Sequence, residues 1–356
     1  MRIKTIQEIL AEKNLDALLV ASDSNRQYLS GFSGSSGALV VTRTDSYLIT
    51  DSRYTTQATS QTAPFGVEVV QHNGPMALDI ELVLQKHGVK TLGFEAEHVD
   101  YATYLNWDKQ FSAELIATTE LVERVRMIKD AEELKLMDKA VEIIEDTYLH
   151  VLDFAKAGMR ELDVALEAEF YMRKLGASGT SFDTIVASGW RGSLPHGAAS
   201  DKVIEDGDLV TLDFGAVYQS YCSDMTRTFA VGTPRSEKLV DIYNIVLKSQ
   251  LAGCDAVAQG LSGAAVDKVV RDIITDAGYG EYFGHGTGHA VGMDVHENPR
   301  VSPAGETILE PGMVVTIEPG IYIPELGGIR IEDMILVTAD GNRNMMKKAP
   351  KELRII

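Results

Sequence analysis

The sequence contains little cysteine, with only Cys222 and Cys254 among 356 residues. Two cysteines cannot build the disulfide framework of a small secreted domain, and such sparse use suits a reducing compartment. Long apolar runs are also missing. The run at 17–21 is far below membrane-spanning length, and Glu8 and Glu12 interrupt the apolar pattern where a signal peptide needs a continuous core. We therefore expect a cytoplasmic protein that is neither exported nor inserted in a membrane.

Positive charge is scarce as well. The chain has 33 lysines and arginines against 52 aspartates and glutamates, a formal net charge of −19 at pH 7. So acidic a surface repels phosphate backbones and anionic lipid headgroups, which argues against nucleic-acid and membrane-surface binding. The apolar fraction of 45% and the charged fraction of 24% are those of an ordinary globular protein. At about 150 residues per domain, the length favours roughly two domains.

The first third of the chain alternates helical and strand-like patterns. Apolar residues at helical spacing over 3–10 precede a short apolar run at 15–21. A helical pattern then covers 75–87, and strand-like segments lie at 38–42, 47–50, 67–70 and 91–94. This alternation predicts a small α/β domain, which we place at residues 1–122.

The remainder, residues 123–356, shows the order helix, helix, strands twice. Asp130 and Glu133 form a capping pair at the start of the first helix. Helices are expected at 130–158, 161–175, 236–258 and 262–277, and β-rich stretches at 180–231 and 290–337. The repeated order predicts an α+β fold whose two halves, related by a pseudo-twofold axis, bring antiparallel sheets together under covering helices. The seam between the halves is a natural place for a ligand pocket.

Several motif-like segments lack a residue that their chemistry requires. His289 stands where a dinucleotide-binding loop starting at Gly284 would need its third glycine. The glycine-rich segment 31–37 has neither the Gly-Lys pair of a phosphate-binding loop nor the closing glycine of a nucleophile elbow. Arg300 replaces the second histidine of a zinc-protease helix that His296 would begin. These three classes are therefore not supported.

Two aspartates stand out in the strand-like sequence of the first half. Asp213 lies at the end of an apolar run, and Asp224 follows eleven residues later in another strand-like run. A hairpin turning around 217–220 would place both carboxylates on neighbouring strands, facing one pocket. A surface ion pair between Asp224 and Arg227, with Asp213 in a turn, is an equally open explanation for either aspartate alone.

Two glutamates in the second half occupy similar positions. Glu318 ends one apolar run, and Glu332 lies inside another. Charged residues seldom sit in such runs unless they are paired. An ion pair between Glu332 and Arg330 would explain one of them, although Arg330 could instead serve a substrate anion.

Three histidines lie between these acidic residues. His285 and His289 belong to a glycine-rich turn, whose glycines permit close approach to a bound group, and His296 follows a strand-like run at 291–295. A lone histidine is more often a packed or surface residue than a ligand. Four carboxylates in one pocket, however, cannot all be ionised without cations, and two divalent metals would supply the compensating charge. A dinuclear site would then comprise Asp213, Asp224, His289, Glu318 and Glu332.

Taken together, these motifs make the chain similar to the pita-bread metallopeptidases of the aminopeptidase P and Xaa-Pro dipeptidase (prolidase) group, over nearly its whole length. The resemblance rests on Asp213-Phe-Gly, Cys-Ser-Asp224-Met-Thr-Arg-Thr, Gly-His285-Gly-Thr-Gly-His289, Val-His296-Glu, Ile-Glu318-Pro-Gly-Ile-Tyr322 and Ile-Arg330-Ile-Glu332-Asp. Segments 28–37 and 50–54 resemble the smaller, creatinase-like non-catalytic domain of that group.

The resemblance implies a role for each matching residue. Asp213 would bind one metal, Asp224 and Glu332 would bridge the two, and His289 with Glu318 would hold the second. Catalytic roles would fall to His196, His285, His296 and Glu318, and substrate binding to Arg300, Arg330 and Tyr322. The segment Leu194-Pro-His196-Gly departs slightly from the sequence that is most common in the family at this position. Arg300 resembles the prolidase arginine that binds the carboxylate of a dipeptide.

The implied reaction is hydrolysis of the peptide bond before proline in small peptides, by a hydroxide bridging the metals. A carboxylate-rich ligand set favours Mn²⁺, with Co²⁺ and Zn²⁺ open. The resemblance also implies a homodimer. It leaves open whether dipeptides or longer peptides are preferred, and whether the enzyme is an aminopeptidase not restricted to proline. A catalytically silent pita-bread protein that binds partners is a further alternative, against which the intact ligand set argues.

Overall fold

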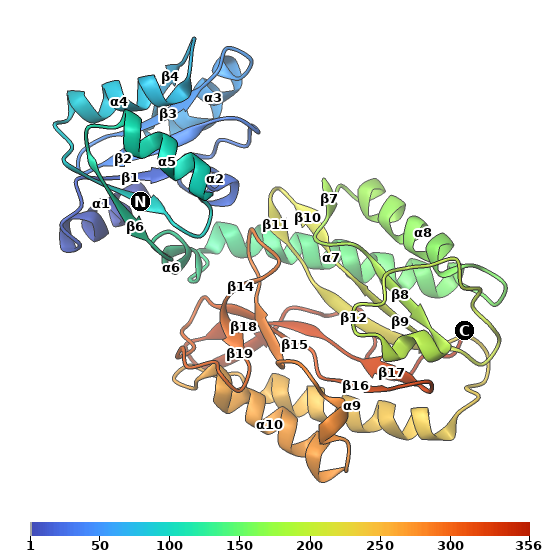
Figure 1. Ribbon diagram of the computed structural model, residues 1–356. Helices are drawn as coiled ribbons and strands as arrows, with labels where there is room; N and C mark the ends of the chain where they lie inside the picture. Colours follow the sequence, from blue (N-terminus) through green and yellow to red (C-terminus); the bar gives the residue numbers. More distant parts are fainter. Residues whose placement is uncertain (1) are drawn as a thin grey trace. The chain divides into compact units, whose positions relative to one another are not determined.

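The computed structural model describes residues 2–356. The chain divides into two compact units, Met1–Arg126 and Met127–Ile356, which are described separately below (Figure 1). No helix in the described part of the chain combines the length and the apolar character needed to cross a bilayer.

The first unit is built on a mixed six-stranded sheet with the order β4-β3-β2-β1-β5-β6. The β1-β2 and β2-β3 pairs are antiparallel, and the other three pairs are parallel. The strands are β1 (Ala17–Val20), β2 (Ala38–Thr42), β3 (Ser46–Thr50), β4 (Glu68–Gln71), β5 (Thr91–Glu95) and β6 (Glu114–Thr118). The helices are α1 (Arg2–Glu12), α2 (Asp23–Ser30), α3 (Thr55–Thr62), η1 (Ala63–Phe65), α4 (Met76–Lys86), α5 (Tyr101–Gln110) and α6 (Glu123–Arg126).

The periodic segments of this unit form the predicted elements, but the helices α2, α3, η1, α5 and α6 and the strand β6 were not predicted. The helix α3 buries only Ala58 and Thr62, and α5 buries only Trp107, so neither presents a continuous apolar stripe. The helix α2 is short and begins at a serine cap, Ser22. The edge strand β6 has no fully buried residue. These elements carry too few core positions for periodicity to reveal them.

The first half of the second unit begins with the expected helix pair. Asp130 caps the first helix and forms a capping box with Glu133, as predicted. Two three-stranded sheets follow, with the orders β12-β9-β8 and β11-β10-β7. The elements are α7 (Ala131–Phe154), α8 (Glu161–Lys174), β7 (Gly179–Thr180), β8 (Ile185–Ser188), η2 (Gly189–Ser193), β9 (Leu209–Phe214), β10 (Ala216–Tyr218), β11 (Tyr221–Cys222) and β12 (Met225–Ala230).

The second half repeats the order of helix pair and strands. It has a five-stranded sheet, β14-β13-β15-β18-β19, and a separate β16-β17 ribbon. Figure 1 shows α7 and α8 on one side of the unit and α9 and α10 on the other, with the strands between them. The elements are α9 (Glu237–Ala256), α10 (Gly263–Asp276), η3 (Gly280–Tyr282), β13 (Gly288–Ala290), β14 (Glu297–Val301), β15 (Val314–Ile317), β16 (Gly320–Ile323), β17 (Gly327–Arg330), β18 (Asp333–Thr338) and β19 (Gly341–Asn344).

Three local predictions in this half were wrong. The segment 291–295 is not a strand but a turn, in which the Gly292 amide bonds to the Asp294 carbonyl at 3.0 Å. His289 lies on β13 and not in the glycine-rich turn itself. The apolar run around Glu332 is divided between β17 and β18, which belong to different sheets, and Glu332 lies in the break. Val291, Met293 and Val295 alternate in the first case, and apolar residues on both sides of Glu332 in the third concealed the break.

Two hydrophobic clusters hold the strands of the second unit in place, and each includes residues of both halves. Tyr148 of α7 and Phe229 of β12 pack edge to face in the first cluster, with ring centroids 6.4 Å apart. Ile242 and Val246 of α9 belong to the second cluster, together with Ile317 at the end of β15. Both clusters lie directly behind strands whose ends carry polar residues, so these ends are held firmly.

Candidate metal centre

A cavity of about 920 Å³ lies within the second unit and takes its lining from both halves. Every site residue predicted from the sequence lines it. These residues are His196, Asp213, Asp224, His285, His289, His296, Arg300, Glu318, Tyr322, Arg330 and Glu332.

The two aspartates of the first half come together through the predicted hairpin. Strands β10 and β11 form it, and Gln219 and Ser220 at its turn have φ angles of 46° and 71°. Asp213 lies on β9, and Asp224 directly precedes β12, the antiparallel neighbour of β9. The alternative surface pair between Asp224 and Arg227 is wrong, because Arg227 is completely buried and pairs with Asp333 at 2.8 Å.

Three side chains from the two halves offer ligand atoms to one point. One ligand atom each from Asp224, His289 and Glu332 lies within 4.8 Å of the other two, and residues 2–356 contain no second group of three or more such side chains. Glu318 joins this group from the end of β15, since its Oε1 lies 3.4 Å from His289 Nε2. Asp224 Oδ2 lies 3.6 Å from the same nitrogen.

Asp213 has one satisfied and one unsatisfied oxygen. Its Oδ2 pairs with Arg330 Nη2 at 2.5 Å, whereas its Oδ1 is buried and has no hydrogen-bond partner among the described residues. The suggested ion pair between Arg330 and Glu332 is wrong. Glu332 Oε2 instead accepts a hydrogen bond from Thr226 Oγ1 at 2.7 Å. A buried, orphaned carboxylate oxygen beside three further carboxylates fits a site that a cation completes.

The raised pKa values of the clustered carboxylates also indicate a site that cations complete. Removal from water raises the pKa of Asp224 and of Glu332 well above the usual range, and the negative charges of neighbouring carboxylates raise each further. Burial likewise raises the pKa of Glu318 to about 8. Without cations these groups would keep protons at neutral pH, so the donor set suits divalent metals that would replace those protons.

The ring of His289 is oriented for ligation. Its Nδ1 bonds to the Ala290 carbonyl at 3.1 Å, which directs Nε2 toward Asp224 and Glu318. Burial lowers the pKa of this imidazole and keeps it neutral. A neutral ring with a backbone partner on one nitrogen and a free lone pair on the other is the usual form of a metal-binding histidine.

A chain of hydrogen bonds forms one wall of the cavity. Arg330 Nη1 donates to the Tyr322 hydroxyl at 2.8 Å and to the Pro195 carbonyl at 3.2 Å. The Tyr322 hydroxyl lies 3.0 Å from His285 Nε2, and His285 Nδ1 lies 2.7 Å from the Gly286 carbonyl. Burial lowers the pKa of His285 to about 4, so the ring is neutral. Both of its nitrogens therefore have protein partners, with Nε2 accepting from Tyr322.

The remaining predicted residues lie at the open side of the cavity. His196 and His296 are exposed, and the His296 ring stands edge-on to that of His289 with centroids 4.4 Å apart. Arg300 lies on β14 directly opposite His289 of β13, and it is also exposed. These three side chains can reach a molecule that enters the cavity.

Several residues that shape the site were missed. Thr226 binds Glu332, and Lys129 forms a buried ion pair of 3.0 Å with Glu297, the neighbour of His296. A threonine in a strand carries no sequence signal, and Lys129 pairs with a residue 168 positions away. Phe182, Asp183, Asn298 and Ser302 also line the cavity and were not predicted.

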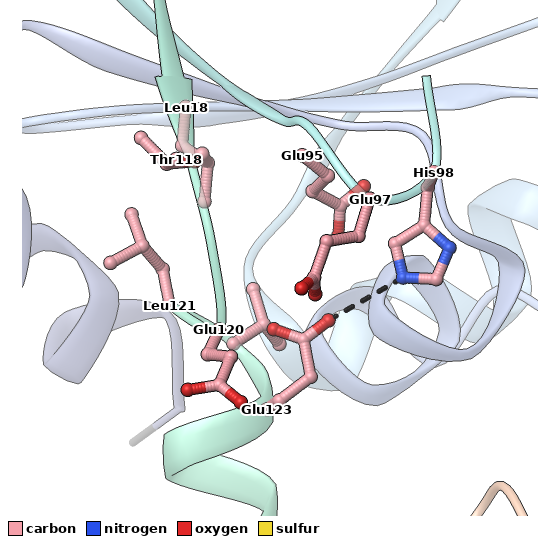
Figure 2. Close-up of a pocket in the computed structure, with 9 residues that line it drawn as sticks. Leu18, Glu95, Glu97, His98, Thr118, Glu120, Leu121 and Glu123 are labelled. Carbon is pink, nitrogen blue, oxygen red and sulfur yellow. Dashed lines mark ion pairs between the residues drawn. The ribbon is translucent and has the colours of Figure 1, made fainter. Parts of the chain in front are cut away.

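A second, small pocket lies in the first unit and is lined by acidic residues (Figure 2). Glu95 Oε2 accepts the amides of Ala21 and Ser22 at 2.6 and 2.8 Å, immediately before α2. Figure 2 shows Glu123 beside His98, with an oxygen-to-nitrogen distance of 3.6 Å. Glu95 therefore acts as a structural support for the start of α2.

Comparison with known proteins agrees with this geometry. Residues 135–339 match Metallopeptidase family M24, and residues 2–128 match the Creatinase/Prolidase N-terminal domain. The chain belongs to metallopeptidase family M24. Membership confirms the predicted α+β pita-bread fold and implies divalent metal ions, for which the clustered carboxylates and His289 are suitable ligands.

Individual M24 proteins are similar over the whole chain. A Bacillus subtilis protein named "Uncharacterized peptidase YqhT" is 48% identical, covering 100% of both chains. A Pyrococcus horikoshii protein named Xaa-Pro dipeptidase is 39% identical over 97% of each chain. Among solved structures, an Xaa-Pro dipeptidase from Bacillus anthracis superposes with a TM-score of 0.97 at 46% identity, covering 100% of this chain and 99% of that one.

Proposed function

We propose that this M24 peptidase is an exopeptidase that hydrolyses the bond between an N-terminal residue and proline. The observation that carries the proposal is the single cavity into which both halves direct four carboxylates and a neutral imidazole, with His196, His296 and Arg300 at its open side. The similar proteins named Xaa-Pro dipeptidase support the choice of substrate.

The metal ligands in this proposal are Asp213, Asp224, His289, Glu318 and Glu332. They would hold two divalent ions, Mn²⁺ by preference and Co²⁺ or Zn²⁺ as alternatives, because carboxylates dominate the set. When bound, the ions would activate water and polarise the scissile carbonyl. Asp224 and Glu332, whose ligand atoms converge with that of His289, would bridge the two ions, as the resemblance to prolidases implies.

The protein's own groups move the protons and orient the peptide. Glu318, which lies at the end of β15 in this cavity, takes the proton of the attacking water, since the bound cations would keep its carboxylate ionised. His296 and His196, both exposed in the cavity, donate hydrogen bonds to the carbonyl oxygen as negative charge develops on it. His285 acts from the cavity wall, where it holds Tyr322 in place.

Three residues bind the substrate in this proposal. Arg300 pairs with the free carboxylate of a dipeptide, whose charge and planarity suit a guanidinium group. Tyr322 and Arg330 form a continuous polar wall, fixed by the 2.8 Å bond between them, against which the peptide lies.

We also propose that residues 1–122 form the non-catalytic domain and 123–356 the catalytic domain of a cytoplasmic homodimer. The low cysteine content supports the location, and the resemblance to prolidases supports the dimer. Light scattering at working concentrations tests the dimer. A fully active monomer would contradict it.

The proposed activity is tested by comparing substrates on the metal-loaded enzyme. Protein stripped with chelator and reloaded with Mn²⁺ is given Xaa-Pro, Xaa-Pro-Xaa and, as a control, Xaa-Ala. We expect proline substrates to be cleaved only after reloading. Equal cleavage of Xaa-Ala would indicate an aminopeptidase not restricted to proline. A folded protein that binds no Mn²⁺ would favour a silent binding protein.

A further inference from the structure

The helix α10 carries an ion pair on the side that faces the histidine-bearing loop 283–287. Asp267 is only 2% exposed, and its Oδ1 and Oδ2 pair with Arg271 Nη2 and Nε, each at 2.8 Å. This fork-to-fork arrangement is the strongest geometry available to an arginine and a carboxylate. The pair is thus preorganised on the helix.

Both members of the pair also hold the loop. Asp267 Oδ1 accepts from the backbone amide of Thr287 at 3.1 Å and from its hydroxyl at 2.8 Å. Arg271 donates to the carbonyls of Phe283 and His285 at 3.1 and 2.8 Å. Thr287 is completely buried, so without Asp267 two donors would lose their partner in the interior.

The held loop reaches the reactive groups in two ways. The Phe283 ring, covered on one face by Arg271 at 4.3 Å, meets the His285 ring edge-on with centroids 5.0 Å apart. The Thr287 carbonyl accepts the backbone amide of Glu318 at 2.8 Å. One ion pair therefore fixes the backbone on both sides of the site, at His285 and at Glu318.

The first half of the unit has an equivalent ion pair, which also involves a buried carboxylate on its second helix. Glu161, at the start of α8, is completely buried and accepts hydrogen bonds from Ser188, Arg191 and Ser200. These residues flank the segment that carries His196. In both halves the second helix thus presents a buried carboxylate, paired with an arginine, to a histidine-bearing loop.

We infer that Asp267 and Arg271 are positioning residues, which hold His285 and Glu318 in the geometry that catalysis requires. The catalytic part of this inference rests on the proposed function. The same helix supplies a matched control, since Lys268 and Asp272 form an i,i+4 ion pair of 2.7 Å that is exposed to solvent.

The kinetic test compares Arg271→Met and Asp267→Asn with Lys268→Met and Asp272→Asn in the Mn²⁺-loaded enzyme on Xaa-Pro. We expect the first two to lower kcat by about 10- to 100-fold, because small displacements of reacting groups are costly. Their KM should change by less than about threefold, since Arg300 is untouched and Arg330 still holds Tyr322 by the 2.8 Å bond. Arg271→Lys should recover part of the loss. The two control variants should match the wild type.

A second measurement reports position without activity. The imidazole ¹⁵N spectrum of the metal-free protein, with His285 assigned through His285→Gln, should show the Nδ1–H tautomer. Arg271→Met should move the His285 signals and leave those of the exposed His98 and His196 in place. Should Arg271→Met not fold, Thr287→Val removes only the hydroxyl bond to Asp267 and should move the same signals.

Unchanged kcat together with unchanged His285 signals in Arg271→Met and Asp267→Asn would overturn the inference. So would a loss of activity that the Asp272→Asn control shares. If the wild-type enzyme fails to cleave Xaa-Pro, the proposed function is wrong, and the imidazole spectra still decide whether the pair positions His285.

Discussion

Thr226 of the first half donates its hydroxyl to Oε2 of Glu332 in the second half, at 2.7 Å. The same hydroxyl oxygen accepts from Arg330 Nε at 3.1 Å. An uncharged side chain thus lies between a proposed bridging carboxylate and the arginine that pairs with Asp213. It fixes the orientation of the carboxylate and separates the two charges.

We expect Thr226→Val, which keeps the shape and removes the hydroxyl, to weaken Mn²⁺ binding by about 10- to 100-fold, the usual cost of losing a group that orients a ligand. Isothermal titration calorimetry measures the affinity directly. Thr226→Ser retains the hydroxyl and should bind as the wild type does. Equal affinities for the valine and serine variants would show that the bond to Glu332 is unimportant for ligation.

Asp224→Asn should abolish hydrolysis of Xaa-Pro and reduce the metal content below two ions per chain, because a neutral amide cannot bridge two cations. Elemental analysis after gel filtration measures the metal. Asp241→Asn makes the same change at an exposed position of α9 and serves as the control. Near-normal turnover with two bound metals would refute the bridging role of Asp224.

The carboxylates of the candidate site were predictable because charged residues at the end of an apolar run, or inside one, are conspicuous. Asp213, Glu318 and Glu332 were found in this way, and the structure brings all three to one cavity. The partners of such residues were not predictable. Arg227 pairs with Asp333, 106 positions away, while the sequence suggested its near neighbour Asp224. Sequence patterns reveal spacing between near neighbours, whereas ion pairs between distant residues depend on how the sheets pack.

Arg300→Ala should raise KM for dipeptides much more than for longer peptides, if the guanidinium pairs with the carboxylate that only a dipeptide places there. Losing such a charge-assisted bond costs about 1.5 to 3 kcal/mol, or roughly ten- to a hundredfold in affinity. Steady-state kinetics on Xaa-Pro and Xaa-Pro-Xaa make the comparison. Equal effects on both substrates, or no effect on either, would exclude this role.

The half-buried His285 predicts a pH dependence of stability. Its pKa falls from 6.5 to about 4 on folding, chiefly through burial. Between these two pH values the imidazole is protonated in the unfolded chain and neutral in the folded chain. The stabilising contribution is present above pH 6.5 and is lost as pH falls toward 4. At about 1.4 kcal/mol per pH unit, the loss between pH 6.5 and 5 is about 2 kcal/mol.

His285→Gln removes this titration, so the wild type should lose more stability than the variant between about pH 7 and pH 5. Urea unfolding of the metal-free proteins at both pH values measures the difference, and the absence of metal avoids acid-driven release of ligated ions. The same loss in both proteins would mean that His285 is accessible to protons in the folded state.

Both backbone groups of Glu332 bond to the other half of its unit. Its amide donates to the Thr226 carbonyl at 3.1 Å, and its carbonyl accepts from Arg227 Nη1 at 2.6 Å. Parting the halves at this point would break both bonds and expose the completely buried Arg227. The unit is therefore unsuited to hinge bending along its seam. A peptide can therefore reach the carboxylates only from the open side of the cavity, so the exposed side chains there, His196, His296 and Arg300, are the first groups that it meets.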